Sequence, residues 1–293
     1  MEAGTVTMPT AEVGQEEQSE LREITGPAAL GGGRKRFLEL LVLMSVTDFK
    51  KTYFGTMLGY LWSLLRPLML FGVLLVVFTK ILRVGSTIPN YSMFLLINIV
   101  LFGFFQEATM NATQSVVARE GIVRKTQFPR LVIPFSATAT GLFNLLVNLI
   151  AVFGFMLASG LYPRLSWFML IPVILALTAL TAGMSMLLSA LYVRRRDTLI
   201  IWSVLSMALF YGSAVLIPVE FAGETLQKIM FINPIVPILV QTRVWMIDPN
   251  APTAVELAGG WAHLIPAAVV FIAVCVLGWW YFNREAPRVA EEL

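Results

Sequence analysis

The sequence predicts an all-α integral membrane protein with six transmembrane helices, an N-terminal amphipathic interface helix and two short re-entrant helices before the last span. Three observations predict this fold class. The chain of 293 residues is 57% hydrophobic and only 13% charged, with a mean hydropathy of +0.77, whereas a soluble chain is about a quarter charged. Apolar runs of about 20 residues, the length that a helix needs to cross a bilayer core, occupy most of the chain. These runs are continuous, unlike the alternating strands of a membrane barrel.

The region before the first apolar run has two parts. Residues 1–33 are acidic, small and polar, and they lack the positive start and apolar core of a signal peptide. We expect them to form a disordered cytoplasmic tail. Residues 34–58 place Leu38, Val42 and Val46 on one face, which favours an amphipathic helix lying in the membrane interface. The residues singled out in this helix are Asp48, Lys50, Lys51 and Tyr53.

Six apolar runs are predicted to span the membrane as one transmembrane domain over residues 59–283, followed by a short tail, 284–293. In the fourth run, Ala179 and Gly183 recur at helical spacing and indicate close packing against a neighbouring helix. The predicted spans are about 59–82, 91–117, 133–159, 167–192, 198–217 and 261–282.

The basic residues are unevenly divided between the two sides that six spans define. Of the 21 Lys and Arg residues, sixteen fall on the side of the two termini and five on the other. By the positive-inside rule, both termini are therefore cytoplasmic, in a multi-pass protein of the plasma membrane. The five residues on the other side are Lys80, Arg83, Arg164, Lys228 and Arg243.

The stretch between the fifth and sixth spans, 219–246, contains two apolar pieces that are too short to cross a bilayer. They cover roughly 224–232 and 235–246. A pair of re-entrant helices that dip into the outer leaflet and gate a pore would fit, and a surface amphipathic hairpin is the alternative. The candidate outer-gate residues are Glu220, Glu224, Asn233 and Pro234.

Polar side chains recur on single faces of two spans. Glu107, Asn111 and Gln114 follow each other at i, i+4 and i+7, and Asn144 and Asn148 are four residues apart. Polar residues inside a membrane face the bundle interior or a cavity, so these side chains either line a channel or bond helix to helix. The candidate channel residues are Tyr60, Trp62, Glu107, Asn111, Gln114 and Tyr211.

The predicted cytoplasmic loop REGIVRKTQFPR, residues 119–130, carries five charges in twelve residues. A topology signal needs only its basic residues. That role leaves Glu120, Gly121 and the closing Phe128-Pro129-Arg130 unexplained. A short charged helix with a fixed exit is instead typical of a site that docks a soluble partner.

Three sets of residues resemble the membrane permeases of type-2 ATP-binding-cassette (ABC) exporters, specifically those that move polysaccharides. The likeness covers roughly residues 37–283, and the short loop at about 83–90 favours the polysaccharide kind over drug or lipid exporters because it leaves no room for a soluble domain. The matching segments are DFKKTY (48–53), LGYLW (58–62) and RP (66–67); EG (120–121), RK (124–125) and FPR (128–130); and NP (233–234) with QTR (241–243).

The resemblance implies that residues 119–130 are a coupling helix seated on a nucleotide-binding ATPase subunit. Two copies of this chain would pair with two such subunits around a central path for a lipid-linked polysaccharide. ATP and Mg²⁺ would bind the partner subunit. O-antigen, teichoic acid and cell-wall galactan precursors all suit such a permease, with a slight preference for galactan. The implied coupling residues are Arg119, Glu120, Gly121, Arg124, Lys125, Phe128, Pro129 and Arg130.

Other functions find less support in the residues. The chain lacks a phosphate-binding loop of the G-x-x-x-x-G-K-[ST] kind, so it is not the ATPase. It has one histidine, His263, and one cysteine, Cys275, which argue against a metal site and a disulfide framework. A membrane-embedded enzyme would need paired carboxylates or a metal, and an ion-coupled carrier often shows an internal repeat. Nothing in the sequence indicates nucleic-acid binding; membrane lipids are expected neighbours.

Overall fold

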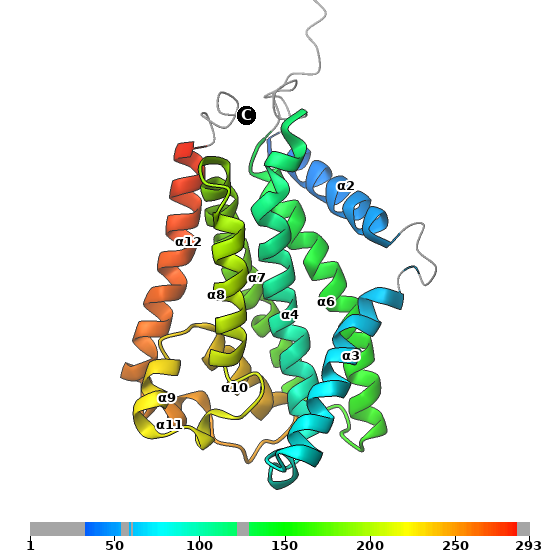
Figure 1. The fold of residues 1–293 in the computed structure, drawn as a ribbon, viewed down its shortest axis with the longest axis vertical. Coiled ribbons are helices and arrows are strands. Elements are labelled where there is room, and N and C mark those ends of the chain that lie inside the picture. Colours follow the sequence, from blue (N-terminus) through cyan, green and yellow to red (C-terminus); the bar gives the residue numbers. More distant parts are fainter. Residues whose placement is uncertain (1–32, 54–58, 60, 122–128, 286–293) are drawn as a thin grey trace, which may run out of the picture.

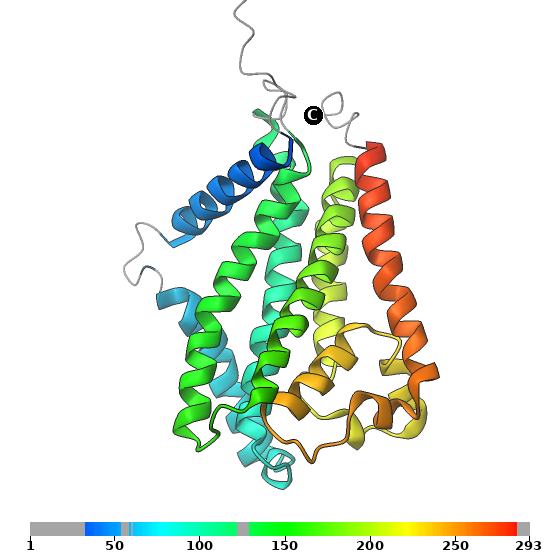
Figure 2. The same cartoon turned by 180° about the vertical axis from the view of Figure 1, so that it is seen from behind.

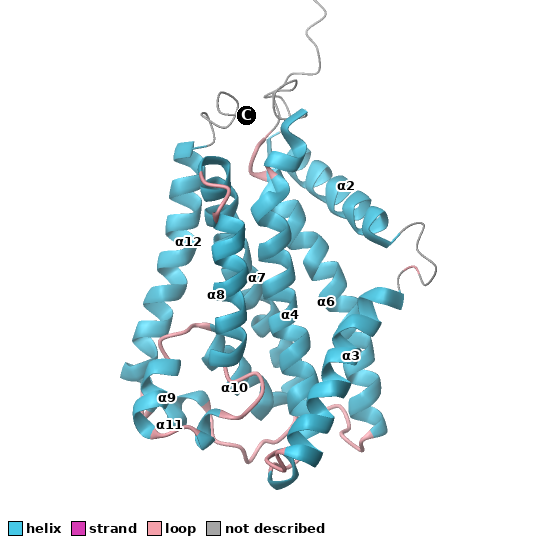
Figure 3. Ribbon diagram, viewed as in Figure 1, coloured by secondary structure: helices cyan, strands magenta, loops and turns pink. Residues whose placement is uncertain are grey.

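The computed structural model describes residues 33–53, 59, 61–121 and 129–285. Within these ranges every regular element is helical, as Figure 3 shows, which confirms the predicted all-α class. The helices form an elongated bundle (Figure 1). Its long helices are α3 (Leu61–Val76), α4 (Tyr91–Ser115), α6 (Val132–Ala158), α7 (Leu170–Arg194), α8 (Thr198–Gly212) and α12 (Ile265–Glu285).

In the part of the chain that the structure describes, five helical stretches are long and apolar enough to cross a membrane, and the count reaches six if the bent pair α9 and α10 is taken as one span. Three of the five are lengthened by a short turn: η1 (Val77–Ile81) extends α3, η4 (Leu165–Met169) precedes α7, and η6 (Trp261–Leu264) precedes α12. The multi-pass architecture expected from hydropathy is therefore present.

The fifth predicted span, 198–217, is shorter in the structure. It corresponds to α8, whose 15 residues give a length of about 22 Å, less than the roughly 30 Å of a hydrocarbon core. The helix ends at Gly212, and Ala214 adopts a positive φ of 57°.

Two side chains of α4, a helix distant in sequence, stabilise the irregular backbone that follows α8. The Tyr91 hydroxyl donates to the Leu216 carbonyl at 2.9 Å, and the Asn98 amide lies 3.5 Å from the Ala214 carbonyl. Irregular backbone survives at membrane depth when protein buries it in this way. Because both donors belong to α4, the residues of the fifth run alone do not reveal where its helix stops.

The N-terminal helix α2 (Gly33–Tyr53) lies obliquely to the bundle, at the end where α12 finishes (Figures 1 and 2). We call this end the α2 end. Phe37 and Phe49 of α2 make edge-to-face contacts with Phe135 and Phe143 of α6. The apolar side chains of α2 that do not contact α6 are exposed, among them Leu43, at 64%. This arrangement suits a helix resting in the membrane interface.

The opposite end of the bundle, which we call the α10 end, carries the short elements (Figure 1). The pair α9 (Glu224–Met230) and α10 (Ile235–Met246) is bent by 104° at the break between them. These bounds agree with the two short apolar pieces seen in the sequence. The other elements here are η2 (Gly85–Thr87), η5 (Val219–Phe221) and α11 (Ala254–Ala258).

The centre of the bundle is α4. Its most apolar 18-residue window is 78% buried, and Leu95, Leu96 and Ile97 have no exposed surface. The corresponding windows of α3 and α12 are only 17% and 11% buried. A helix that is apolar all round and buried belongs to a core, so α4 is the element against which the others are arranged.

Helices α7 and α12 cross at two glycines. A Cβ atom on Gly278 would lie 2.1 Å from the Gly183 carbonyl oxygen, and one on Gly183 would lie 2.9 Å from the Cys275 Cα. The Cys275 thiol also approaches the Ala179 carbonyl, at 3.6 Å. The small residues noted at helical spacing thus allow a close approach of two helices.

Candidate functional site: a polar cavity and the two ends of the bundle

A cavity of about 780 Å³ lies between α3, α4, α6 and α8. Helix α4 contributes the largest share of its lining, and α3 and α8 stand on either side of α4 (Figure 1). The cavity is unusual for this apolar bundle because polar and aromatic side chains meet in it. The polar ones are Ser63, Arg66, Gln106, Glu107, Asn111, Asn144, Asn148, Ser203 and Ser206, and the aromatic ones are Trp62, Phe104 and Phe210.

Hydrogen bonds join these polar side chains across the helices. The Asn144 amide of α6 donates to the Glu107 carboxylate of α4 at 3.1 Å, and the Gln106 amide lies 3.3 Å from the Ser206 hydroxyl of α8. Arg66 of α3 lines the same space and interacts electrostatically with Glu107. The cavity therefore contains a carboxylate, a guanidinium and several amides, which suits a ligand rich in hydroxyl groups.

The structure brings part of the predicted channel set together. Trp62, Glu107 and Asn111 line the cavity. Gln114 and Tyr211 are exposed and are not among its lining residues, while Tyr60 lies outside the described residues. Asn144 lines the cavity and also donates a hydrogen bond from α6 to α4.

Sequence reasoning did not select five of the polar lining residues on α3, α4 and α8, among them Ser63 of α3. Arg66 is a charged residue inside a predicted span, and such a residue usually faces a cavity or a partner, so its position alone could have identified it as a candidate. Gln106 precedes Glu107 directly, so it is displaced by about 100° around α4 from the stripe that periodicity picked out. Ser203 and Ser206 carry small hydroxyls that are common in packed membrane helices, and periodicity alone does not distinguish them.

At the α2 end, an ion pair connects the interface helix to the start of the charged loop. The Arg119 guanidinium contacts the Asp48 carboxylate, and both side chains are partly buried. A second ion pair joins α7 to α12, with the Arg194 Nε 3.0 Å from the Glu285 carboxylate. Two pairs of chain segments are thus fixed to each other beside the predicted docking site.

The structure describes only part of that docking site. Arg119 closes the turn η3 (Val117–Arg119), and the helical residues Glu120 and Gly121 follow. The carbonyl oxygens of Pro129 and Arg130 accept the first backbone hydrogen bonds of the following helix, α6. Arg124, Lys125 and Phe128 lie outside the described residues. In α2, Lys50 and Lys51 are exposed and Tyr53 is the last residue of the helix.

At the α10 end, three of the four candidate gate residues take part in specific packing. The Asn233 amide donates to the Ser213 hydroxyl at 2.8 Å and its carbonyl accepts the Ile235 N–H at 3.0 Å. Pro234 is buried at the start of α10, and Glu220 forms an ion pair with Arg243. Glu224 is exposed at the first position of α9. The break between α9 and α10 is therefore anchored to the segment after α8.

The described residues contain no group of three or more His, Cys, Asp or Glu side chains that could hold a metal ion. The polar groups that do converge are amides, hydroxyls and single charges, so the arrangement is one for binding.

Residues 39–246 match the family described as ABC-2 type transporter. The chain belongs to this family. The matched ABC-2 region begins in α2 and ends with α10, so it contains all the helices that line the polar cavity. The predicted assignment to type-2 ABC permeases is confirmed.

Three curated relatives match this chain over 70% to 87% of its length. Two come from Klebsiella pneumoniae, and each is named O-antigen export system permease protein RfbA. The first is 32% identical over 87% of this chain and 95% of its own length. The second is 31% identical over 70% of this chain and 79% of its own length. A protein of the same name from Myxococcus xanthus is 26% identical over 74% of this chain and 84% of its own length.

Proposed function

We propose that this chain is the transmembrane subunit of an ATP-driven exporter that moves a lipid-linked polysaccharide from the cytoplasmic side across the plasma membrane. The curated relatives support the cargo class, since all three are named as O-antigen export permeases and one is matched over 95% of its length. A galactan precursor is the specific cargo we favour among surface glycans.

The single observation that carries the proposal is the chemistry of the polar cavity. A sugar chain needs hydrogen-bonding partners for its hydroxyls and flat apolar faces for its rings. The cavity offers amides at Gln106, Asn144 and Asn148 and aromatic surfaces at Trp62 and Phe210. An apolar drug or lipid would cover these amides without using the donor and acceptor capacity that their contacts within the protein leave over, and that desolvation is unfavourable.

The assembly we propose is two copies of this chain with two ATPase subunits, which bind ATP and Mg²⁺. The cavity is lined by one copy's α3, α4, α6 and α8, and exposed apolar side chains such as Val73 of α3 and Val204 of α8 flank it. A second copy placed over these helices would enclose a continuous path and bury that surface. With both termini cytoplasmic, the α2 end would face the ATPase subunits, and residues 119–130 would transmit their movement.

The proposal is tested in cells from which the chain is deleted. Such cells should accumulate the lipid-linked polysaccharide inside and lose it from the surface, and re-expression should restore it. Affinity purification in mild detergent should recover an ATPase subunit, and the yield should fall when residues 119–130 are replaced by a Gly/Ser linker. Normal surface polysaccharide in the deletion strain would contradict the cargo. Recovery of the ATPase with the linker variant would contradict the docking site.

A further inference from the structure

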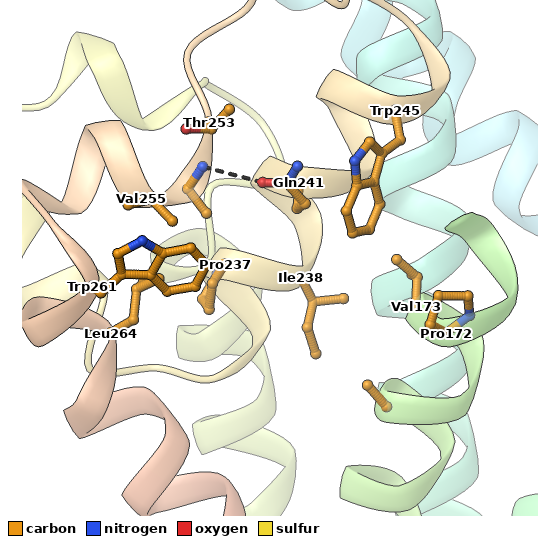
Figure 4. Close-up of a pocket in the computed structure, with 12 residues that line it drawn as sticks. Pro172, Val173, Pro237, Ile238, Gln241, Trp245, Thr253, Val255, Trp261 and Leu264 are labelled. Carbon is orange, nitrogen blue, oxygen red and sulfur yellow. Dashed lines mark hydrogen bonds between the residues drawn. The ribbon is translucent and has the colours of Figure 1, made fainter. Parts of the chain in front are cut away.

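A second cavity, of about 610 Å³, lies at the α10 end and is separate from the polar cavity (Figure 4). It is bounded by α7, α10, the turn around α11 and η6. Figure 4 shows Trp245 and Trp261 on opposite sides of the space, with Ile238 and Pro237 between them and Val173 on α7. None of its lining residues is charged.

Four lining side chains carry hydrogen-bonding groups: Gln241, Thr253 and the indoles of Trp245 and Trp261. The first two are engaged with neighbouring backbone. The Gln241 carbonyl oxygen accepts the Ala254 N–H at 3.3 Å, drawn as the dashed line in Figure 4, and the Thr253 hydroxyl accepts the Glu256 N–H at 3.3 Å as the cap of α11. A molecule in this cavity would therefore meet mainly hydrocarbon and indole surface. Water is a poor occupant because it needs two to four polar partners.

The cavity is continuous with the surface that α7 and α12 present to the bilayer. Ile171 and Leu175 each come one position before a lining residue of α7, so they lie on the neighbouring stripe of that helix. Their side chains are 56% and 65% exposed. On the other side, Ile265 follows the lining residue Leu264 and is 58% exposed. Both helices are long and apolar enough to span a membrane, so we expect these exposed side chains to face lipid tails.

We propose that this cavity holds one hydrocarbon chain of a membrane phospholipid from the leaflet at the α10 end. An empty apolar cavity would forfeit the dispersion contacts of its walls, and lipid tails are the apolar molecules present at the highest concentration beside it. Its volume is within the range of small-molecule sites. The chain would lie between α7 and α10 and would support α10 in addition to the anchor of Asn233 on Ser213.

The test uses the full-length chain with its co-purified partners in vesicles of phosphatidylethanolamine and phosphatidylglycerol. In one arm a phosphatidylglycerol carries a photoactivatable diazirine near the end of one acyl chain, and in the other arm a polyprenyl phosphate carries the same group. After illumination, mass spectrometry of peptides locates the adducts. The cavity-filling variant is Ala176→Phe, and the matched control is Leu175→Phe, one position away on the lipid-exposed stripe of the same helix. Val255→Phe fills the cavity from α11 if Ala176→Phe does not fold.

We expect the phospholipid probe to label the peptides that carry Trp245 and Trp261, with a loss of at least about fivefold in the cavity-filling variant and a change below about twofold in the control. Equal labelling of the two variants, or labelling of these peptides by the polyprenyl probe alone, would overturn the proposal. The assay measures occupancy in the membrane and not transport. Its outcome is therefore independent of whether the exported cargo is a polysaccharide.

Discussion

Arg243 of α10 and Glu220 of η5 form a largely buried ion pair, with Nη1 2.5 Å from Oε1, and the Arg243 guanidinium stands 5.6 Å from the centre of the Phe94 ring of α4. One side chain thus connects α10, the segment after α8 and the central helix α4. The Arg243 side chain is only 9% exposed. Because a buried cation is stable only with a partner, the position of α10 depends on Glu220.

Replacing Glu220 with Ala should destabilise the protein by on the order of 3 kcal/mol, since Arg243 would keep its charge in apolar surroundings. Thermal unfolding in detergent micelles, followed by tryptophan fluorescence, measures the effect. Glu224→Ala is the matched control, because this nearby carboxylate is exposed and its removal should change stability by less than about 1 kcal/mol. Similar melting temperatures for the two variants would refute the role of the ion pair.

The Asp48–Arg119 pair should matter for coupling more than for stability. A partly exposed ion pair contributes about 1 kcal/mol or less, so Asp48→Arg and Arg119→Asp should each fold normally while lowering the export that accompanies each unit of ATP hydrolysed. The double exchange restores opposite charges and should recover export. If both single variants transport at the native rate, the contact between α2 and the charged loop has no part in transmission.

Glu120 and Gly121, at the start of the charged loop, should be needed to couple ATP hydrolysis to export. A proline at Gly121 removes a backbone donor and disfavours a helical turn by about 3 kcal/mol, so Gly121→Pro should uncouple ATP hydrolysis from export without unfolding the bundle, as should Glu120→Arg. Gly121→Ala is the control, because a Cβ at this position meets no atom within 4 Å. Export and ATPase recovery are measured together. Native values in both the Pro and Arg variants would exclude a coupling role.

In the polar cavity, Asn144→Leu removes the amide that donates to Glu107 and presents an apolar side chain to the substrate path. We expect surface polysaccharide to fall severalfold, because the cavity loses an amide that can bond to sugar hydroxyls and Glu107 loses a hydrogen-bond donor. Leu146→Ala, an exposed position of the same helix, should leave export unchanged. Equal export by the two variants would mean that Asn144 serves packing alone.

The crossing of α7 and α12 should be intolerant of any side chain. Gly278→Ala places a Cβ 2.1 Å from a carbonyl oxygen, and such overpacking typically destabilises by about 1–3 kcal/mol. Gly154→Ala in α6 meets no atom within 4 Å and should be neutral or slightly stabilising. The melting temperatures of the two variants are compared in the same detergent, and that of Gly278→Ala should be lower. Matching values would show that the two helices can move apart freely.

Most of the fold was predictable because hydropathy and periodicity are local properties. The spans and the two short helices at 224–246 follow from runs of apolar residues and a single Asn-Pro break. The end of α8 did not follow, because it depends on donors from Tyr91 and Asn98, more than a hundred positions away along the chain.

The candidate site was only partly predictable for the same reason. The stripe containing Glu107 and Asn111 was visible as a helical repeat, whereas the inclusion of Arg66 depends on how α3 packs beside α4. The contact between Asp48 and Arg119 joins positions 71 residues apart, and each of them reads in the sequence as an ordinary interfacial charge.

The glycine crossing of α7 and α12 also limits how the protein can change shape. Backbone meets backbone there, and the Arg194–Glu285 pair ties the same two helices again at the α2 end. Neither helix can rotate or slide against the other without breaking these contacts, so we expect the two helices to move as one rigid body. Any opening of a path for cargo would then have to carry α7 and α12 together.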